Sequence, residues 1–251
     1  MNWRKIRKWS LIVAAVPVSL AALLGTALAY PEPFFAYHTE RGRLAVYSDQ
    51  PFDTAKAQTL LAHIDERVSR SPLDTHQAHA IFVANSEWRR RIFMNVAAGA
   101  GGVNFYPVTR NVFLRTSDID HNKLIRPNGT PAENPRTLTY YGAHEIGHSL
   151  TGEARGMAHL WNWRLPAWVR EGYADYVGLG GRGQIDITAY YKRYRAHDPH
   201  FLVGSGFYDR YRMLTYYFLD RKGWSVQRLL DCNLTIDEAQ TLMDADMAKS
   251  G

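Results

Sequence analysis

The feature that most constrains this chain is the pentapeptide His144-Glu145-Ile146-Gly147-His148. Two histidines four residues apart project from one face of a helix, one turn from each other. Their nitrogens can reach a single zinc ion at about 2.0–2.1 Å, while Glu145 is placed to act as a general base on a zinc-bound water. The segment therefore predicts a helix that carries two metal ligands. The alternative is a polar helix face with an incidental glutamate.

A catalytic zinc site needs a third protein ligand and an open fourth position. One version of the motif continues to a histidine six residues after the second, but Ala154 stands there. Glu171 follows His148 by 23 residues, which is enough for a loop and a returning helix. Asp175 lies one turn beyond Glu171 and is expected to accept a hydrogen bond from the outer nitrogen of His144. This arrangement predicts one Zn²⁺ ion with an open position.

The pentapeptide and the later segment Pro166–Asp175 (PAWVREGYAD) together resemble the gluzincins, the thermolysin-like zinc metallopeptidases. The similarity is greatest to short bacterial members with a W-x-x-E-G-x-A second motif, and it covers roughly residues 140–176. The resemblance implies a zincin-like fold and the following roles: zinc ligands His144, His148 and Glu171, general base Glu145, and Asp175 as the acid that orients a ligand histidine.

The resemblance also implies a Tyr or His side chain that faces the oxyanion from a later helix. Tyr208 fits this role best when the helix is aligned on Gly223, and Tyr211 is second. An ordinary packing tyrosine is an equal alternative, since the chain has 15 tyrosines. Arg170 stands where thermolysin has an Asn, so the substrate contact of that Asn is not expected here.

Apolar patterning predicts an α+β fold, with a β-containing N-terminal lobe and a helical C-terminal lobe. Short apolar runs indicate strands, at residues 43–49, 79–85, 103–107 and 111–116. Apolar positions at helical spacing indicate helices, at 52–69, 167–177, 186–196, 208–221, 225–231 and 236–249. Another helix is expected from Glu87, capped by Ser86. Asn134-Pro135 is typical of a helix start and predicts where the histidine helix begins.

In the gluzincin architecture an edge strand over the cleft, upstream of the zinc helix, binds peptide in extended form. The resemblance places this strand at residues 111–116. Its substrate-facing candidates are Val112, Phe113, Leu114 and Arg115. An ordinary core strand is the alternative.

The first 29 residues are typical of an export segment. The stretch from Trp9 to Pro31 has no charged residue and contains Ala27-Leu28-Ala29, a pattern that suits signal cleavage. Four basic residues precede it: Arg4, Lys5, Arg7 and Lys8. Residues 1–29 are therefore predicted to be a cleaved signal peptide or an uncleaved membrane anchor. Residues 30–251 are predicted to form one domain outside the cytoplasm, either periplasmic, secreted or anchored to the membrane.

The charge distribution argues against nucleic acid as a partner. Of the formal charge of +6, the four basic residues of the export segment supply +4, which leaves +2 for the rest. Residues 30–251 are so close to neutral that they are not expected to form a strongly basic surface for binding phosphates. Cys232 is the only cysteine, so an intramolecular disulfide is impossible and thiolate zinc ligation is disfavoured.

The expected function is zinc-dependent hydrolysis of peptide bonds, with a peptide or protein as substrate. Two alternatives remain open at the level of sequence. One is a zinc hydrolase of a non-peptide amide, such as a cell-wall or lipid amide. The other is a non-catalytic envelope binding module on the same fold, which the intact Glu145 disfavours. The aromatic stretch Trp161–Trp168 could line a cleft in either case.

Overall fold

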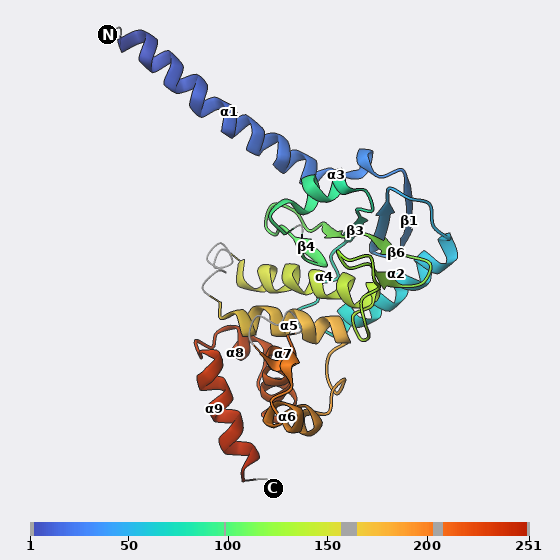
Figure 1. Ribbon diagram of the computed structural model, residues 1–251, viewed down its shortest axis with the longest axis vertical. Helices are drawn as coiled ribbons and strands as arrows, with labels where there is room; N and C mark the ends of the chain where they lie inside the picture. The colour runs from blue at the N-terminus through green and yellow to red at the C-terminus, as the bar shows by residue number, and fades with distance from the viewer. Residues whose placement is uncertain (1–2, 98, 157–164, 203–207, 250–251) are drawn as a thin grey trace.

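The computed structural model describes residues 3–97, 99–156, 165–202 and 208–249 (Figure 1). Side chains of residues 3–14 and of residue 96 are outside this description. Among the described residues, every strand lies in the first half of the chain and the second half contains helices without strands, which confirms the predicted α+β class.

A five-stranded sheet forms the upper lobe in the order β1-β2-β3-β5-β4. Strands β2, β3 and β5 run parallel, and the two outer strands β1 and β4 run antiparallel to their neighbours. The strands are β1 (Tyr37–Arg41), β2 (Leu44–Ser48), β3 (His79–Val83), β4 (Gly102–Asn104) and β5 (Val112–Leu114). A small hairpin of β6 (Ser117–Asp118) and β7 (Lys123–Leu124) follows. All four predicted strands are present, whereas the polar strand β1 was not predicted.

The prediction that residues 111–116 form the edge strand is wrong. Strand β5 lies between β3 and β4, and Val112, Phe113 and Leu114 are all fully buried. Three consecutive apolar residues are typical of a strand covered on both faces, which is where an inner parallel strand lies. The edge strand next to β5 is β4, which begins at Gly102.

The helices of the sheet lobe are α2 (Thr54–Ser69) and the single turn α3 (Glu87–Arg89). After α3 the chain continues as a π-helical turn (Arg90–Met94) and then as a 3-10 turn (Asn95–Ala97). Asp53 caps α2 by accepting from the Lys56 amide. Ser86 does not cap α3 as predicted, because its hydroxyl accepts instead from the guanidinium of Arg89 at 2.9 Å.

Two long helices, α4 (Leu138–Arg155) and α5 (Ala167–Leu179), pack against each other below the sheet (Figure 1). Helix α4 does not begin at Asn134-Pro135. Thr137 caps it by accepting from the Tyr140 amide, and Asn134-Pro135 lies in the preceding turn. Gly180, with a φ of +98°, ends α5 in the left-handed conformation that glycine favours.

Small residues let α4 and α5 approach closely. A Cβ atom added to Gly147 would lie 3.2 Å from the Cα of Ala174, and one added to Gly178 would lie 3.0 Å from the Tyr140 ring. Larger residues at these positions would separate the two helices. The close approach is what brings the motif histidines of α4 to the acidic face of α5.

The C-terminal lobe is helical, as predicted, with element ends within a few residues of the expected ones. Its elements are α6 (Ile187–Arg195), a 3-10 turn (Pro199–Phe201), α7 (Asp209–Tyr216) with a π-helical extension (Tyr217–Arg221), α8 (Val226–Leu230) and α9 (Ile236–Met247). Thr235 and Glu238 form a capping box at the start of α9. The main apolar core is continuous from the sheet through α2, α4 and α5 to α9.

Helix α1 (Trp3–Ala29) projects away from the body, and a 3-10 turn (Glu32–Phe34) follows it (Figure 1). At its end Leu28 is buried among Phe35, Phe82 and other apolar residues, on the face of the sheet that is turned away from the main core. Asn111 donates hydrogen bonds to the carbonyl oxygens of Leu28 and Ala29. Within the described residues, none of the helices has both the length and the apolar character to cross a membrane. A signal or anchor role for residues 1–29 stays a prediction.

Candidate metal centre

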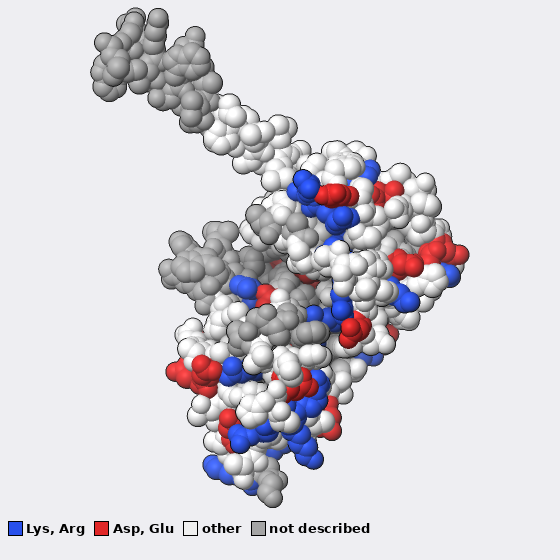
Figure 2. Space-filling model, in the orientation of Figure 1, with Lys and Arg blue, Asp and Glu red and all other residues white. Residues whose placement is uncertain are grey.

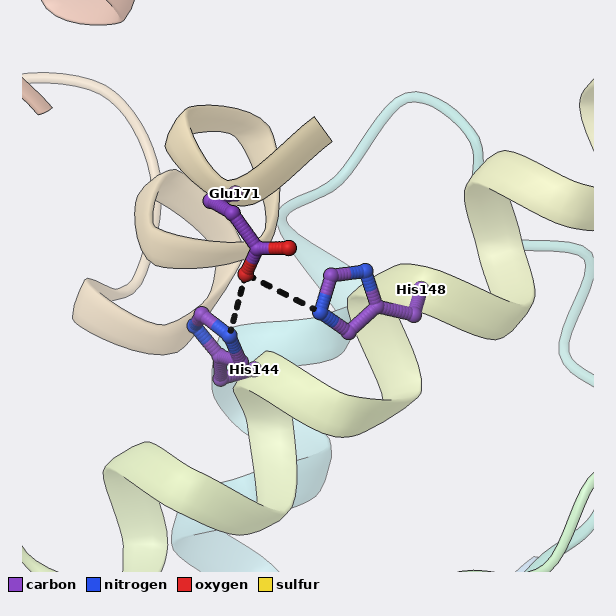
Figure 3. Close-up of side chains that lie close together, drawn as sticks. All are labelled: His144, His148 and Glu171. Atoms are coloured by element: carbon purple, nitrogen blue, oxygen red, sulfur yellow. Dashed lines mark ion pairs between the residues drawn. The ribbon is translucent and has the colours of Figure 1, made fainter. Parts of the chain in front are cut away.

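His144, His148 and Glu171 meet at the interface of α4 and α5 (Figure 3). The Oε2 atom of Glu171 lies 3.7 Å from Nε2 of His144 and 3.6 Å from Nε2 of His148. The two imidazole rings are nearly perpendicular, with centroids 5.0 Å apart. The structure thus brings together the three residues predicted as metal ligands.

The donor set fits a divalent metal ion. Ligand atoms at about 2.0–2.1 Å from a tetrahedral zinc stand about 3.3 Å apart, close to the two distances between histidine and glutamate. One ligand atom of each residue lies within 4.8 Å of the others. Imidazole is a borderline ligand that suits zinc, and two histidines with one glutamate form a known set of catalytic zinc ligands. The cluster can therefore hold one metal ion.

Arg170 orients the glutamate ligand. Its Nε donates a hydrogen bond of 2.9 Å to Oε1 of Glu171, which leaves Oε2 facing the two histidines. Burial would raise the pKa of Glu171, but the two histidines and Arg170 together hold it well below its usual value. Glu171 is therefore an anion, as a metal ligand must be.

The contact between His144 and Asp175 differs from the predicted one. Nδ1 of His144 lies 3.8 Å from Asp175, which is too far for a hydrogen bond. The hydroxyl of Tyr140 stands between them, donating to Oδ1 of Asp175 with its oxygen 3.4 Å from Nδ1 of His144. Tyr140 lies one turn before His144 on the same helix, so its ring fills the space that a direct bond would need. Asp175 acts on His144 through this tyrosine.

Arg212 completes this chain of contacts from α7. Its Nε lies 2.5 Å from Oδ2 of Asp175, and its Nη1 lies 2.9 Å from Oδ1 of Asp209. The side chains of Asp175 and Arg212 are 0% and 3% exposed, so each charge depends on the other for compensation. The sequence did not point to Arg212 or Tyr140. A tyrosine one turn before the first histidine was the available signal for Tyr140.

Glu145 lies beside the histidine cluster, and only 6% of it is exposed. Burial raises the pKa of Glu145 to about 7, with His144 opposing and Glu171 adding to this rise. Strand β4 covers this carboxylate closely, because a Cβ atom at Gly102 would lie 2.7 Å from Glu145 Oε1. A glycine is therefore required where the edge strand passes the predicted base.

Tyr208 directly precedes α7 and lines the same cavity. Its ring is parallel to that of His144, with centroids 6.4 Å apart. Burial raises the pKa of Tyr208 to about 12, and Glu171 contributes to the rise, so the phenol keeps its proton at neutral pH. Tyr211 stacks on the outer side of Tyr208 and does not line the cavity.

The cluster opens into a cavity of about 600 Å³. One wall is the segment Gly99–Asn104, which includes the edge strand, and another is the α4 face with Glu145. Among the described residues, the charged side chains that line it are Glu145, Glu171 and four arginines: Arg115, Arg126, Arg136 and Arg170. On the face shown in Figure 2, basic and acidic side chains are interspersed over the rest of the body, with no broad basic area.

No protein-family model matches this chain, and no curated protein matches it in sequence. The resemblance to gluzincins therefore rests on the motif residues alone. Of the aromatic stretch Trp161–Trp168, residues 161–164 lie outside the described residues, and Trp168 is buried in the main apolar core.

Proposed function

We propose that this chain is a zinc-dependent metallopeptidase of the gluzincin type, with a zincin-like fold. The observation that carries the proposal is the convergence of His144, His148 and Glu171 beside the buried Glu145, in a cavity bordered by a sheet edge. Two histidines and one glutamate are the ligand set of catalytic zinc in hydrolases of this kind.

The side chains around the site divide the chemistry among them. Bound zinc supplies Lewis acidity, which lowers the pKa of a water and polarises a carbonyl group. Glu145, with a pKa near 7, suits a group that takes a proton at neutral pH and returns it to the leaving amine. Tyr208 keeps its proton at this pH and lines the cavity, which supports a role as hydrogen-bond donor to a developing oxyanion.

The edge strand supports a peptide as substrate. Strand β4 pairs with β5 on one side only, and its outer side borders the cavity. A peptide in extended form can add to such an edge through main-chain hydrogen bonds. Gly99, Gly101 and Gly102 in and before this strand carry no side chains to obstruct the approach. The strand lies directly against Glu145, so a peptide added here would pass the proposed base.

A diverse peptide library tests the proposal. The zinc-loaded chain is expected to cleave a subset of peptides, and a chelator should abolish cleavage until zinc is restored. Glu171→Gln should lower the zinc content that survives dialysis, because it removes one of three ligands. Cleavage that persists in the chelator, or an unchanged zinc content in the variant, would refute the proposal. Zinc binding without any peptide cleavage would instead favour a non-peptide amide or a binding module.

The proposed place of action is outside the cytoplasm. The basic start, the uncharged stretch and Ala27-Leu28-Ala29 support export by residues 1–29. Fractionation of cells that produce the full chain, together with N-terminal sequencing, tests both the location and cleavage after Ala29.

A further inference from the structure

Arg115 is a buried cation without an anionic partner among the described residues. It follows β5 directly and is only 6% exposed, yet it forms no ion pair with a described carboxylate. Within the described part of the chain, its Nε has no hydrogen-bond partner, and its Nη1 lies 3.5 Å from the carbonyl oxygen of Gly99. A charge removed from water in this way is costly unless an opposite charge compensates it.

The surroundings of Arg115 increase this cost. Burial lowers the pKa of Arg115, and the positive charge of the nearby Arg90 lowers it further. Arg90 itself is held by neutral oxygens, the carbonyl of Asn85 and the hydroxyl of Thr116. Among the residues that the structure describes, no acid forms an ion pair with either arginine.

Arg115 lines the same cavity as the candidate metal centre. Its main-chain amide donates to the carbonyl oxygen of Gly101, so it lies beside the edge strand at which a peptide would add. Of the other arginines that line the cavity, Arg170 is paired with Glu171, Arg126 with Glu133, and Arg136 lies against the Tyr208 ring, and all three are less buried than Arg115. Arg115 is therefore the cation that a bound ligand is best placed to neutralise.

We propose that Arg115 binds a carboxylate of the peptide substrate, which makes this enzyme selective for peptides with a negative charge near the cleaved bond. The inference rests on the proposed peptidase function. A guanidinium offers paired N–H donors that match the two oxygens of a carboxylate. The carboxylate can come from the C-terminus of a short peptide or from an Asp or Glu side chain.

Binding of three peptides distinguishes these two sources without depending on turnover. The first is penta-alanine with a free C-terminal carboxylate, the second has a C-terminal carboxamide, and the third is the carboxamide with one alanine replaced by glutamate. Their affinities are measured by calorimetry for the zinc-loaded full chain carrying Glu145→Gln. Tighter binding of the first peptide than of the second assigns the C-terminus, and tighter binding of the third assigns a side chain. We expect a preference on the order of tenfold or more.

The variant Arg115→Met, made in the same Glu145→Gln chain, tests whether Arg115 causes the preference for a carboxylate. It should abolish the preference for the carboxylate, and it should leave the melting temperature of the ligand-free chain unchanged or higher, because it removes an uncompensated buried charge. The matched control is Arg91→Met, since Arg91 is 76% exposed, pairs with Glu87 and lies outside the cavity wall. The control should keep the preference. If Arg115→Met does not fold, Arg115→Gln replaces it.

Equal binding of the three peptides, or no binding at all, would overturn the proposal. So would a preference that survives in the Arg115 variant. A chain that shows the Arg115-dependent preference but cleaves no peptide would refute the peptidase function while leaving the carboxylate site in place. Cleavage without any preference for a carboxylate would refute the carboxylate site and leave the peptidase function in place.

Discussion

The hydroxyl of Tyr140 donates a hydrogen bond to Asp175 and lies 3.4 Å from Nδ1 of the proposed zinc ligand His144. The tyrosine thus links the carboxylate to the ligand, and Arg212 holds the other oxygen of that carboxylate. The surroundings of this proposed metal ligand thus include residues from α4, α5 and α7. Removal of a partner that orients a ligand histidine commonly weakens metal binding by about 10–100-fold.

Tyr140→Phe tests this link. The variant keeps the ring in the core and removes only the hydroxyl that joins His144 to Asp175. We expect the zinc affinity to fall about tenfold, measured by competition with a chromogenic chelator. The far-ultraviolet circular dichroism should be unchanged. An unaltered zinc affinity would show that the hydroxyl does not orient the ligand.

Arg212→Leu tests the buried ion pair behind the site. The change leaves Asp175 buried without its cation, and losses of about 3–5 kcal/mol in the free energy of unfolding are typical of such a change. Arg210→Leu is a matched control on the same helix, because its partner Asp237 is 84% exposed. The control should cost less than about 1 kcal/mol. Urea unfolding of both variants measures the difference, and equal losses would contradict the assigned role.

Gly102→Ala tests the contact between the edge strand and Glu145. The added Cβ would lie 2.7 Å from Cγ and Oε1 of Glu145, so the strand or the base must shift. We expect kcat/KM to fall about 100-fold, as a displacement of about 1 Å near the reacting groups can cause. Zinc content should stay at the level of the unmodified chain. Full activity in this variant would mean that β4 does not constrain the base.

Asp74 should make the stability of the sheet lobe depend on pH. Burial would raise the pKa of Asp74, but hydrogen bonds from Arg43 and the His76 amide, with the charge of Arg43, outweigh burial and hold it below its ordinary value. A carboxyl group with a lowered folded-state pKa stabilises the fold above its unfolded pKa of about 3.9. That stabilisation is lost as the pH falls through the folded-state value.

Asp74→Asn should therefore lower the free energy of unfolding by about 2 kcal/mol at pH 7. The gap between this variant and the unmodified chain should shrink as the pH falls below about 4. Urea unfolding of both proteins between neutral and acidic pH measures the gap. A gap that is constant or widens toward acid would contradict the assignment.

Local patterns predicted the proposed ligands because each signal lies within one helix. His144 and His148 are fixed by their four-residue spacing, and Glu171 and Asp175 by the same spacing on the returning helix. The structure brings these helices together through Gly147 and Gly178. Sequence spacing alone could not reveal how close that contact is.

The features that sequence reasoning missed depend on contacts between distant segments. Arg212 reaches Asp175 from another helix, 37 residues away, and no periodic pattern links the two. A strand at residues 103–107 was predicted, but its place at the sheet edge was not, because β4 has only three residues and begins with a glycine. The more apolar β5 matched the expected pattern better, although its apolar residues reflect burial on both faces.

The most direct test of the central claim is peptide cleavage by the Glu145→Gln variant with its zinc content measured in the same sample. The substitution keeps the shape of the side chain and removes its ability to accept a proton. We expect one zinc ion per chain, as in the unmodified protein, and a fall in kcat of at least about 100-fold. Cleavage at the full rate with zinc bound would contradict the proposed role of Glu145 and, with it, the metallopeptidase mechanism.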